Sequence, residues 1–264
     1  MSKLDRLLKT KAATGLVPEA RPFKTETPGA KEAVLLLHGF TGIPSELSIV
    51  GAALAQKGYA CLAPRYPGHG TDRADFLATR AEDWLRRALD SYLDLASEYP
   101  VVHVLGHSMG GLVATIVAAT FNAPRLILLA PAFKFPGIGA ALSPLIAPFA
   151  PVIRRRRPNL ETDPARKRLF PEYWADDLVS GVVELKRMER AGRRCLPRIH
   201  SKVLVVVGSK DEVVPASVAR FVEARAIGAA SYDSASIEGA GHLFPFDAHS
   251  AKTAEIIGDW MPKP

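Results

Sequence analysis

The sequence is poor in cysteine and has no long apolar run, and each of these absences excludes a class of protein. Only two cysteines, Cys61 and Cys195, occur in 264 residues, which is too few for a disulfide framework or a cysteine-based metal site. The longest apolar region, residues 136–153, is interrupted by prolines and so lacks the roughly 18 uninterrupted apolar residues of a membrane span. Charged residues occur within residues 1–9, where a signal peptide would begin its apolar core. We therefore expect a cytoplasmic protein without a membrane span.

The net charge of +7 comes from one internal segment. Residues 131–200 contain 14 Lys or Arg and 7 Asp or Glu, whereas the rest of the chain has 20 of each sign. A basic segment can attract anionic surfaces or substrates, so a transient contact of this segment with a lipid surface stays open. No nucleic-acid-binding motif accompanies the charge, and we expect no nucleic-acid partner. The pattern does not indicate an oligomeric state.

Apolar segments alternate with amphipathic segments over most of the chain. Runs of apolar and β-branched residues are typical of buried parallel strands, and the segments between them have the apolar spacing of helices. Strands are predicted at 33–38, 59–64, 101–106, 125–130, 203–208 and 230–237, and helices from 45, at 79–97, from 109, and at 218–227 and 248–260. This order predicts an α/β fold in which helices cover both faces of a mostly parallel sheet.

The alternation stops at residue 131 and resumes near residue 201. The segment between them has no predicted strand, but it has many prolines, a run of four arginines and two predicted helices. An insertion at this point is expected to lie over the carboxyl ends of the strands, where the functional loops of such sheets meet. We therefore divide the chain into a leader (1–31), a core (32–130 and 201–264) and an inserted cap (131–200).

The pentapeptide G-H-S-M-G at 106–110 lies between a predicted strand and a predicted helix. In this context G-x-S-x-G is typical of a nucleophile elbow, a sharp turn that lifts a serine hydroxyl above the sheet edge. Gly106 and Gly110 have no Cβ atom, so strand and helix can cross closely there. The pattern predicts Ser108 as a nucleophile. It also leaves the backbone N–H of Met109, at the start of the helix, free to face a developing oxyanion.

Two residues beyond the cap are placed to activate Ser108. A serine nucleophile needs a general base and an acid that orients the base, and after such an elbow they follow in the order acid, then histidine. Asp211 follows the strand at 203–208, and His242 lies in a glycine-rich loop after the last strand. We predict that Asp211 is the acid and His242 the base, with Glu212 as the alternative acid.

A second oxyanion donor is expected in the loop after the first long strand. This loop has the sequence H-G-F-T-G at 38–42, and we assign the donor to the backbone N–H of Phe40. A backbone donor makes no demand on the residue type, so the assignment depends on position and on the flanking glycines. His38 is expected to brace the loop. The chemistry needs no metal and no organic cofactor, and we expect none.

At this point the motifs resemble those of a known family. The segments LLLHGFTG (35–42), PGHG (67–70), EDW (82–84), GHSMGG (106–111) and GH (241–242) are similar to those of the α/β-hydrolase superfamily, and within it to small bacterial carboxylesterases and monoacylglycerol lipases. The resemblance covers nearly the whole chain. It implies Ser108, Asp211 and His242 as catalytic residues and Phe40 and Met109 as oxyanion donors. The proline- and arginine-rich cap departs most from the family, so substrate details transfer poorly.

These features together predict a serine carboxylic-ester hydrolase that cleaves apolar acyl esters through an acyl-enzyme intermediate. The apolar stretch 133–153 could line an acyl pocket or could equally be the small core of the cap. One alternative is a monoacylglycerol lipase with a long-chain substrate. Another, from a different class of function, is a non-catalytic ligand-binding receptor on a hydrolase scaffold, which would be expected to have lost parts of the triad.

Overall fold

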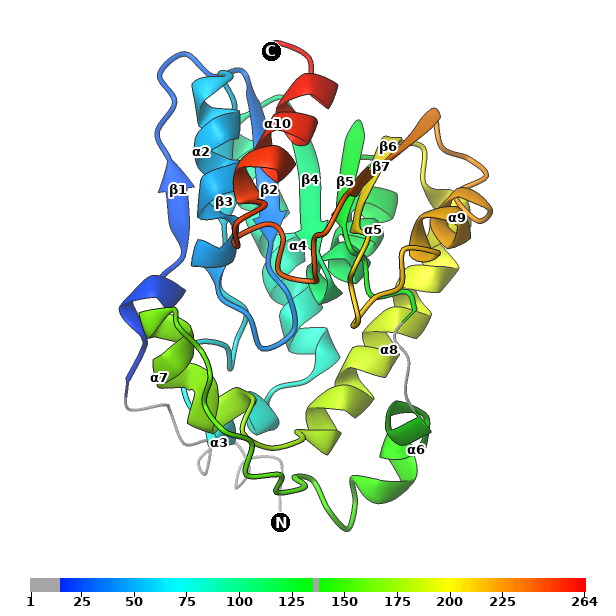
Figure 1. Cartoon of the computed structure of the whole chain (residues 1–264). Helices are drawn as coiled ribbons and strands as arrows, with labels where there is room; N and C mark the ends of the chain where they lie inside the picture. The colour runs from blue at the N-terminus through cyan, green and yellow to red at the C-terminus, as the bar shows by residue number, and fades with distance from the viewer. Residues whose placement is uncertain (1–14, 135–137) are drawn as a thin grey trace.

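The strands of the structure form one sheet. The computed structural model describes residues 15–134 and 138–264, and within these ranges seven strands lie in the order β1-β3-β2-β4-β5-β6-β7. They are β1 (Phe23–Thr25), β2 (Glu32–Leu37), β3 (Ala60–Ala63), β4 (Val101–His107), β5 (Arg125–Leu129), β6 (Lys202–Gly208) and β7 (Ser231–Ile237). All neighbours pair in parallel except β1, which is antiparallel to β3. The predicted α/β fold with a mostly parallel sheet is confirmed (Figure 1).

Helices cover both faces of the sheet, which explains why strands such as β2 and β5 contain continuous apolar runs. Residues 34–37 of β2 and 126–129 of β5 are completely buried, as strands between two helical layers must be. Figure 1 shows α2 (Ser48–Gln56) and α10 (Ser250–Trp260) in front of the sheet, with α4 (Ala81–Glu98) and α5 (Met109–Phe121) behind it. The front pair packs together, and α5 packs on α4 and on α8 (Val179–Cys195).

Several short elements were not predicted, because they are too short to show a period. Strand β1 lies within residues 1–31, where the sequence indicated only a leader, and it extends the sheet by pairing with β3. Helix α3 (Arg73–Ala78) precedes α4, and α9 (Val218–Glu223) ends earlier than predicted. The described residues also form three turns of 3-10 helix: η1 (Pro18–Ala20), η2 (Pro44–Leu47) and η3 (Leu196–Arg198).

The segment between β5 and β6 consists of helices and irregular chain in its described part. It contains α6 (Ile138–Ile146), α7 (Pro164–Tyr173) and α8, one helix more than predicted, together with an isolated β-bridge between Ile153 and Asp177. In Figure 1, α6 and α7 lie below the carboxyl ends of the parallel strands, while α8 rises from this level to the helical layer. The loops that follow β2, β4, β6 and β7 therefore leave the sheet on the side where this segment lies.

Helices long and apolar enough to cross a bilayer do not occur in the ranges 15–134 and 138–264.

Candidate active site

Ser108 lies in the sharp turn between β4 and α5. Its backbone has φ 53° and ψ −116°, a conformation that non-glycine residues rarely adopt and that is common at functional sites. The crossing is so close that a Cβ atom on Gly106 would lie 2.1 Å from the carbonyl oxygen of Gly110, and one on Gly110 would lie 2.0 Å from that of Leu37. Both positions therefore require glycine, and the predicted elbow geometry is present.

The three side chains predicted from separate parts of the sequence are in direct contact. His242 Nε2 lies 3.0 Å from Ser108 Oγ, and His242 Nδ1 lies 2.7 Å from Asp211 Oδ2. Asp211 follows β6 and His242 lies in the loop after β7, so neighbouring strand ends deliver the two residues to the elbow. This arrangement allows a proton to pass from the hydroxyl to the imidazole while the carboxylate orients the ring.

The carboxylate of Asp211 has two separate tasks. Its Oδ1 accepts hydrogen bonds from the backbone N–H groups of Val213 and Val214, both at 2.8 Å, and its Oδ2 faces His242. Burial alone would raise the pKa of Asp211, but the hydrogen bonds from His242 and from the two N–H groups lower it below its usual value. The carboxylate is therefore ionised beside the imidazole. Glu212, the alternative acid, is exposed and lines a cavity in front of Ser108.

The two backbone donors expected for an oxyanion flank the serine. Met109 is the first residue of α5, where N–H groups have no partner within the helix. Phe40 follows Gly39, and a Cβ atom on Gly39 would lie 3.4 Å from the Cβ of Ser108, so the loop passes directly beside Ser108. In the part of the chain that the structure describes, no hydrogen bond occupies the N–H of Phe40 or of Met109. Both are free to bind an oxyanion.

His38 braces the Phe40 loop, as predicted. Its Nδ1 lies 3.0 Å from the carbonyl oxygen of Gly39, and its Nε2 accepts a hydrogen bond from the backbone N–H of Tyr66 at 3.4 Å. Burial, with a smaller effect of His69, lowers the pKa of His38 well below its ordinary value. The ring is therefore neutral, and one nitrogen can donate while the other accepts.

His107 has a role that the sequence did not reveal. Its Nε2 lies 3.0 Å from the carbonyl oxygen of His242. The two rings are 5.0 Å apart. Burial lowers the pKa of His107 to about 3, and the nearby His242 acts in the same direction, so His107 is a neutral donor that holds the His242 loop. No sequence pattern distinguishes this role.

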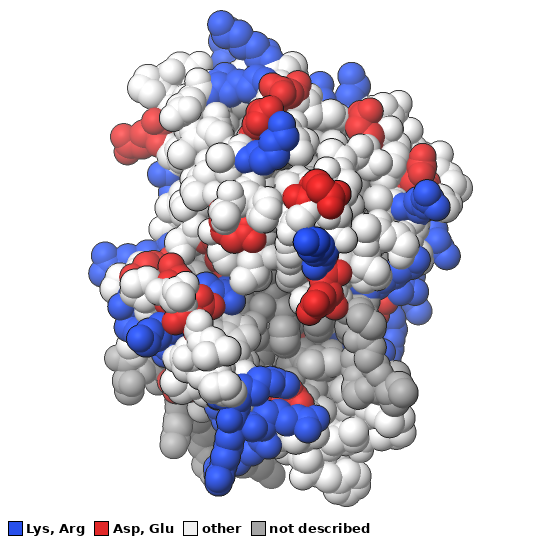
Figure 2. Space-filling view, viewed as in Figure 1, with Lys and Arg blue, Asp and Glu red and all other residues white. Residues whose placement is uncertain are grey.

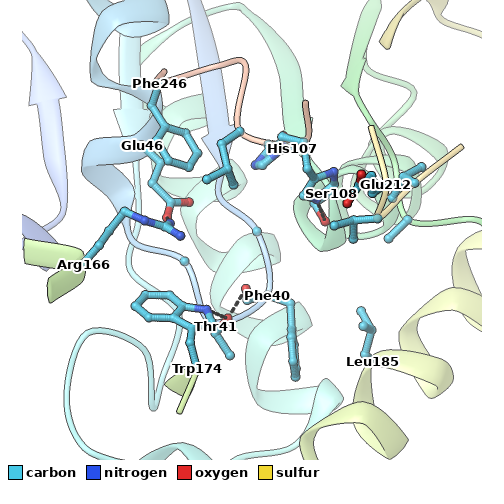
Figure 3. Close-up of a pocket in the computed structure, with 17 residues that line it drawn as sticks. Phe40, Thr41, Glu46, His107, Ser108, Arg166, Trp174, Leu185, Glu212 and Phe246 are labelled. Carbon is cyan, nitrogen blue, oxygen red and sulfur yellow. Dashed lines mark hydrogen bonds and ion pairs between the residues drawn. The ribbon is translucent and has the colours of Figure 1, made fainter. Parts of the chain in front are cut away.

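A cavity of about 570 Å³ opens in front of Ser108 (Figure 3). Part of its wall is polar and was not predicted: Arg166 Nη1 lies 3.1 Å from Glu46 Oε1, and Arg166 Nε lies 2.6 Å from Glu161 Oε2. Glu46 is only 6% exposed. Its burial raises its pKa to about 7, although Arg166 opposes the shift. The partners are 120 residues apart, so no local pattern indicated the pair.

A second cavity of about 390 Å³ adjoins the first, since Phe40, Thr41 and Trp174 line both. Ile146 and Ile153 line it as well, so part of the predicted stretch 133–153 faces a cavity. Phe133, at the start of that stretch, is instead completely buried in the core. Residues 135–137 lie outside the described residues. Among the described residues, no cluster of three or more His, Cys, Asp or Glu side chains could hold a metal ion.

Comparison with known proteins gives a family and several relatives. A model of the alpha/beta hydrolase family matches residues 34–256. A carboxylesterase of Bacillus subtilis (strain 168) is 42% identical over 85 residues, which is 32% of this chain and 35% of that protein. A thermostable monoacylglycerol lipase of Bacillus sp. (strain H-257) is 28% identical over 199 residues, 74% of this chain and 76% of that protein. The match thus spans about a third of the carboxylesterase and three quarters of the lipase.

Solved structures show the same fold at low sequence identity. A metagenome-derived lipolytic enzyme superposes with a TM-score of 0.81 at 21% identity, over 93% of this chain and 98% of that chain. The monoacylglycerol lipase of Paleococcus ferrophilus superposes with a TM-score of 0.71 at 18% identity, over 91% and 97% of the two chains.

Replacement of Gly110 by Ala is expected to destabilise the fold strongly. The new Cβ would meet backbone oxygen atoms of Leu37 and His38, which cannot move without displacing β2. We expect the free energy of unfolding to fall by about 3 kcal/mol or more. Urea unfolding measures this loss, with Gly258→Ala as the control, because a Cβ at Gly258 would meet nothing within 4 Å. Equal stability of both variants would contradict the close crossing.

Replacement of Glu46 by Gln is expected to change how stability depends on pH. Because burial raises the folded-state pKa of Glu46 from 4.5 to about 7, the folded protein binds more protons between these values, and it loses stability as the pH rises through them. Relative to Glu46→Gln, the wild-type free energy of unfolding should fall by up to about 3 kcal/mol between about pH 5 and pH 8. Unfolding at both pH values tests this, with the exposed Glu212→Gln as control. A difference that is the same at both pH values would contradict the raised pKa.

Proposed function

Because the chain belongs to the α/β-hydrolase family, we propose that it is a serine hydrolase of carboxylic esters with apolar acyl groups. The observation that carries this proposal is the hydrogen-bonded series Asp211–His242–Ser108 at the wall of a cavity. These groups are the ones that nucleophilic acyl transfer requires, in the order in which they act. The carboxylesterase and the monoacylglycerol lipase that resemble the chain support the same class.

In the first half of the reaction Ser108 Oγ attacks the ester carbonyl while His242 Nε2 takes the hydroxyl proton. The negative charge that develops on the carbonyl oxygen is bound by the N–H groups of Phe40 and Met109. The imidazolium then returns its proton to the leaving alkoxide, which departs as the alcohol. Asp211 stabilises the imidazolium and keeps the ring in the useful orientation. The acyl group is left on Ser108.

In the second half, water replaces the alcohol. His242 Nε2 takes a proton from the water as its oxygen attacks the acyl carbon, and the same two N–H groups bind the second oxyanion. Collapse of this intermediate returns the proton to Ser108 Oγ and releases the carboxylic acid. These steps use side chains and backbone groups of this chain alone.

Residues 131–200 act as the cap in this proposal. The second cavity, which these residues line in large part, is evidence for a substrate with a long acyl chain. Its lining is largely apolar and includes Ile146, Ile153 and Leu178, and it joins the cavity at Ser108. This observation favours a monoacylglycerol lipase as the second candidate function. A non-catalytic receptor is not favoured, because the contacts among Asp211, His242 and Ser108 are intact.

Two further observations support finer parts of the proposal, namely a cytoplasmic location and a transient contact with a lipid surface. Cys61 and Cys195 are free thiols, which suits the reducing cytoplasm. Leu145 and Phe149 are 72% and 91% exposed in the same segment as the exposed arginines at 154–157, which suits a transient contact with a lipid surface. Figure 2 shows Lys and Arg side chains gathered at the lower edge of the molecule, where the chain between α6 and α7 runs in Figure 1.

The choice of acid predicts different effects for two neighbouring substitutions. Asp211→Asn should misorient His242 and lower kcat by a factor of about 10⁴. Glu212→Gln should change kcat by less than about threefold, because Asp211 Oδ2, and not this exposed carboxylate, lies beside His242 Nδ1. Steady-state hydrolysis of a p-nitrophenyl ester measures both, with Ser108→Ala as the blank. A larger loss of kcat in Glu212→Gln than in Asp211→Asn would assign the role of the acid to Glu212 instead.

A substrate panel tests the proposed function and separates it from the second candidate. The panel consists of p-nitrophenyl esters and 1-monoacylglycerols of graded acyl length. We expect turnover of the simple esters by the wild type and none by Ser108→Ala, because Ser108 Oγ is the attacking atom. A strong preference for long monoacylglycerols would favour the lipase. Failure of the wild type to hydrolyse any member would reject ester hydrolysis.

A further inference from the structure

The residue after the proposed oxyanion donor Phe40 has an unusual backbone conformation. Thr41 has φ 58°, in the left-handed region, where β-branched residues are genuine outliers. Thr41 is 5% exposed, so contacts with water do not offset the energetic cost of this conformation. Such a conformation persists only where the surroundings hold it. The peptide group between Phe40 and Thr41 carries the Phe40 carbonyl, and the Phe40 N–H lies in the peptide group immediately before it. The direction of the Phe40 N–H therefore depends on how this turn is held.

The hydroxyl of Thr41 connects this turn to the cap. Its Oγ1 donates to the carbonyl oxygen of Phe40 at 2.6 Å and accepts a hydrogen bond from the indole Nε1–H of Trp174 at 3.0 Å. The one hydroxyl proton is therefore directed at Phe40, and a lone pair receives the indole. Both bonds are drawn in Figure 3. Trp174 is 133 residues away in sequence and follows α7 of the cap.

Trp174 is in turn fixed by charged and aromatic neighbours. The guanidinium of Arg166 lies 4.7 Å from the centre of the Trp174 ring and 5.3 Å from that of Phe246. Glu46 and Glu161 bind the same guanidinium, and the Arg166 side chain is 14% exposed. Phe246 lies in the same loop as His242, between β7 and α10. The indole therefore has little freedom to leave Thr41.

We propose that Trp174 is a positioning residue: through the hydroxyl of Thr41 it holds the Phe40 turn in the conformation that directs the Phe40 N–H at the oxyanion. The cap then contributes to kcat and not only to substrate binding. This inference rests on the proposed function, because it concerns the stabilisation of the oxyanion in ester hydrolysis. His38 and the aromatic contacts of Phe40 with Phe76 hold the loop from the core side, and Trp174 holds it from the cap side.

The test compares variants that remove or keep the hydrogen bond. Thr41→Val keeps the shape and β-branching but loses the hydroxyl, and Thr41→Ser keeps the hydroxyl. Trp174→Phe keeps an aromatic ring without the N–H. The matched control is Trp260→Phe, because the indole N–H of Trp260 binds Asp233 at the far end of the chain.

We expect Thr41→Val and Trp174→Phe each to lower kcat by about 10- to 100-fold, part of the loss seen when an oxyanion donor is removed. KM should change less than threefold, and Thr41→Ser should recover most of the kcat lost in Thr41→Val. The double variant Thr41→Val/Trp174→Phe should be no slower than the slower single variant, because both remove one interaction. Trp260→Phe should retain wild-type kcat.

A trifluoromethyl ketone supplies a readout that a merely structural role would not change. Ser108 Oγ adds to its carbonyl carbon and leaves a negative oxygen in the oxyanion site, so its Ki should rise by the same factor as kcat falls. An unchanged Ki, a Trp174→Phe effect confined to KM, or losses that multiply in the double variant would each overturn the inference. If Thr41→Val does not fold, Trp174→Phe against Trp260→Phe decides the matter alone. Absence of wild-type turnover would instead refute the proposed function, and the inference with it.

Discussion

The close crossing of α5 over β4 and β2 is the contact on which the whole site depends. At Gly106 and Gly110 the backbones lie so near that no side chain fits between them. The chain between them must therefore turn sharply, and Ser108 takes up the strained conformation that places its hydroxyl above the sheet edge. The same crossing puts the start of α5 beside the loop after β2. Ser108 and the N–H groups of Phe40 and Met109 are thus brought together by one packing constraint.

The parallel sheet supplies the remaining groups by a related geometry. Because β6 and β7 pair in parallel along their whole lengths, with Gly208 opposite Ile237, the loops that follow them leave the sheet side by side. These loops are tied together by the backbone: Lys210 N–H donates to the carbonyl oxygen of Ala240 at 2.9 Å. The strand pairing and this hydrogen bond therefore hold Asp211 and His242 in contact, and no ligand is needed for it.

The parts of the site that follow buried strands were predictable, and those formed by the cap were not. Ser108 and Asp211 follow strands whose apolar runs mark them clearly, and His242 lies in the loop after the weaker strand β7. Parallel strands must bring such positions to one edge. Trp174 and Arg166 come from a segment without an alternating pattern, so their partners depend on how that segment folds back. The role of His107 was not predictable for a different reason. The elbow shows where its side chain begins, but not that it meets the distant carbonyl group of His242.

The basic charge of the cap has a structural explanation in part. Several cap residues form ion pairs with residues outside residues 131–200, namely Arg166 with Glu46, Arg168 with Glu19 and Asp176 with Arg73. The pair of Arg168 is exposed on both sides, and such pairs contribute about 0–1 kcal/mol. The Arg166 pair is nearly buried, where separating the partners would leave an uncompensated charge. The α7 side of the cap is therefore anchored, whereas Leu142 and Leu145 of α6 are exposed at the surface, close to Ile146, which lines the second cavity.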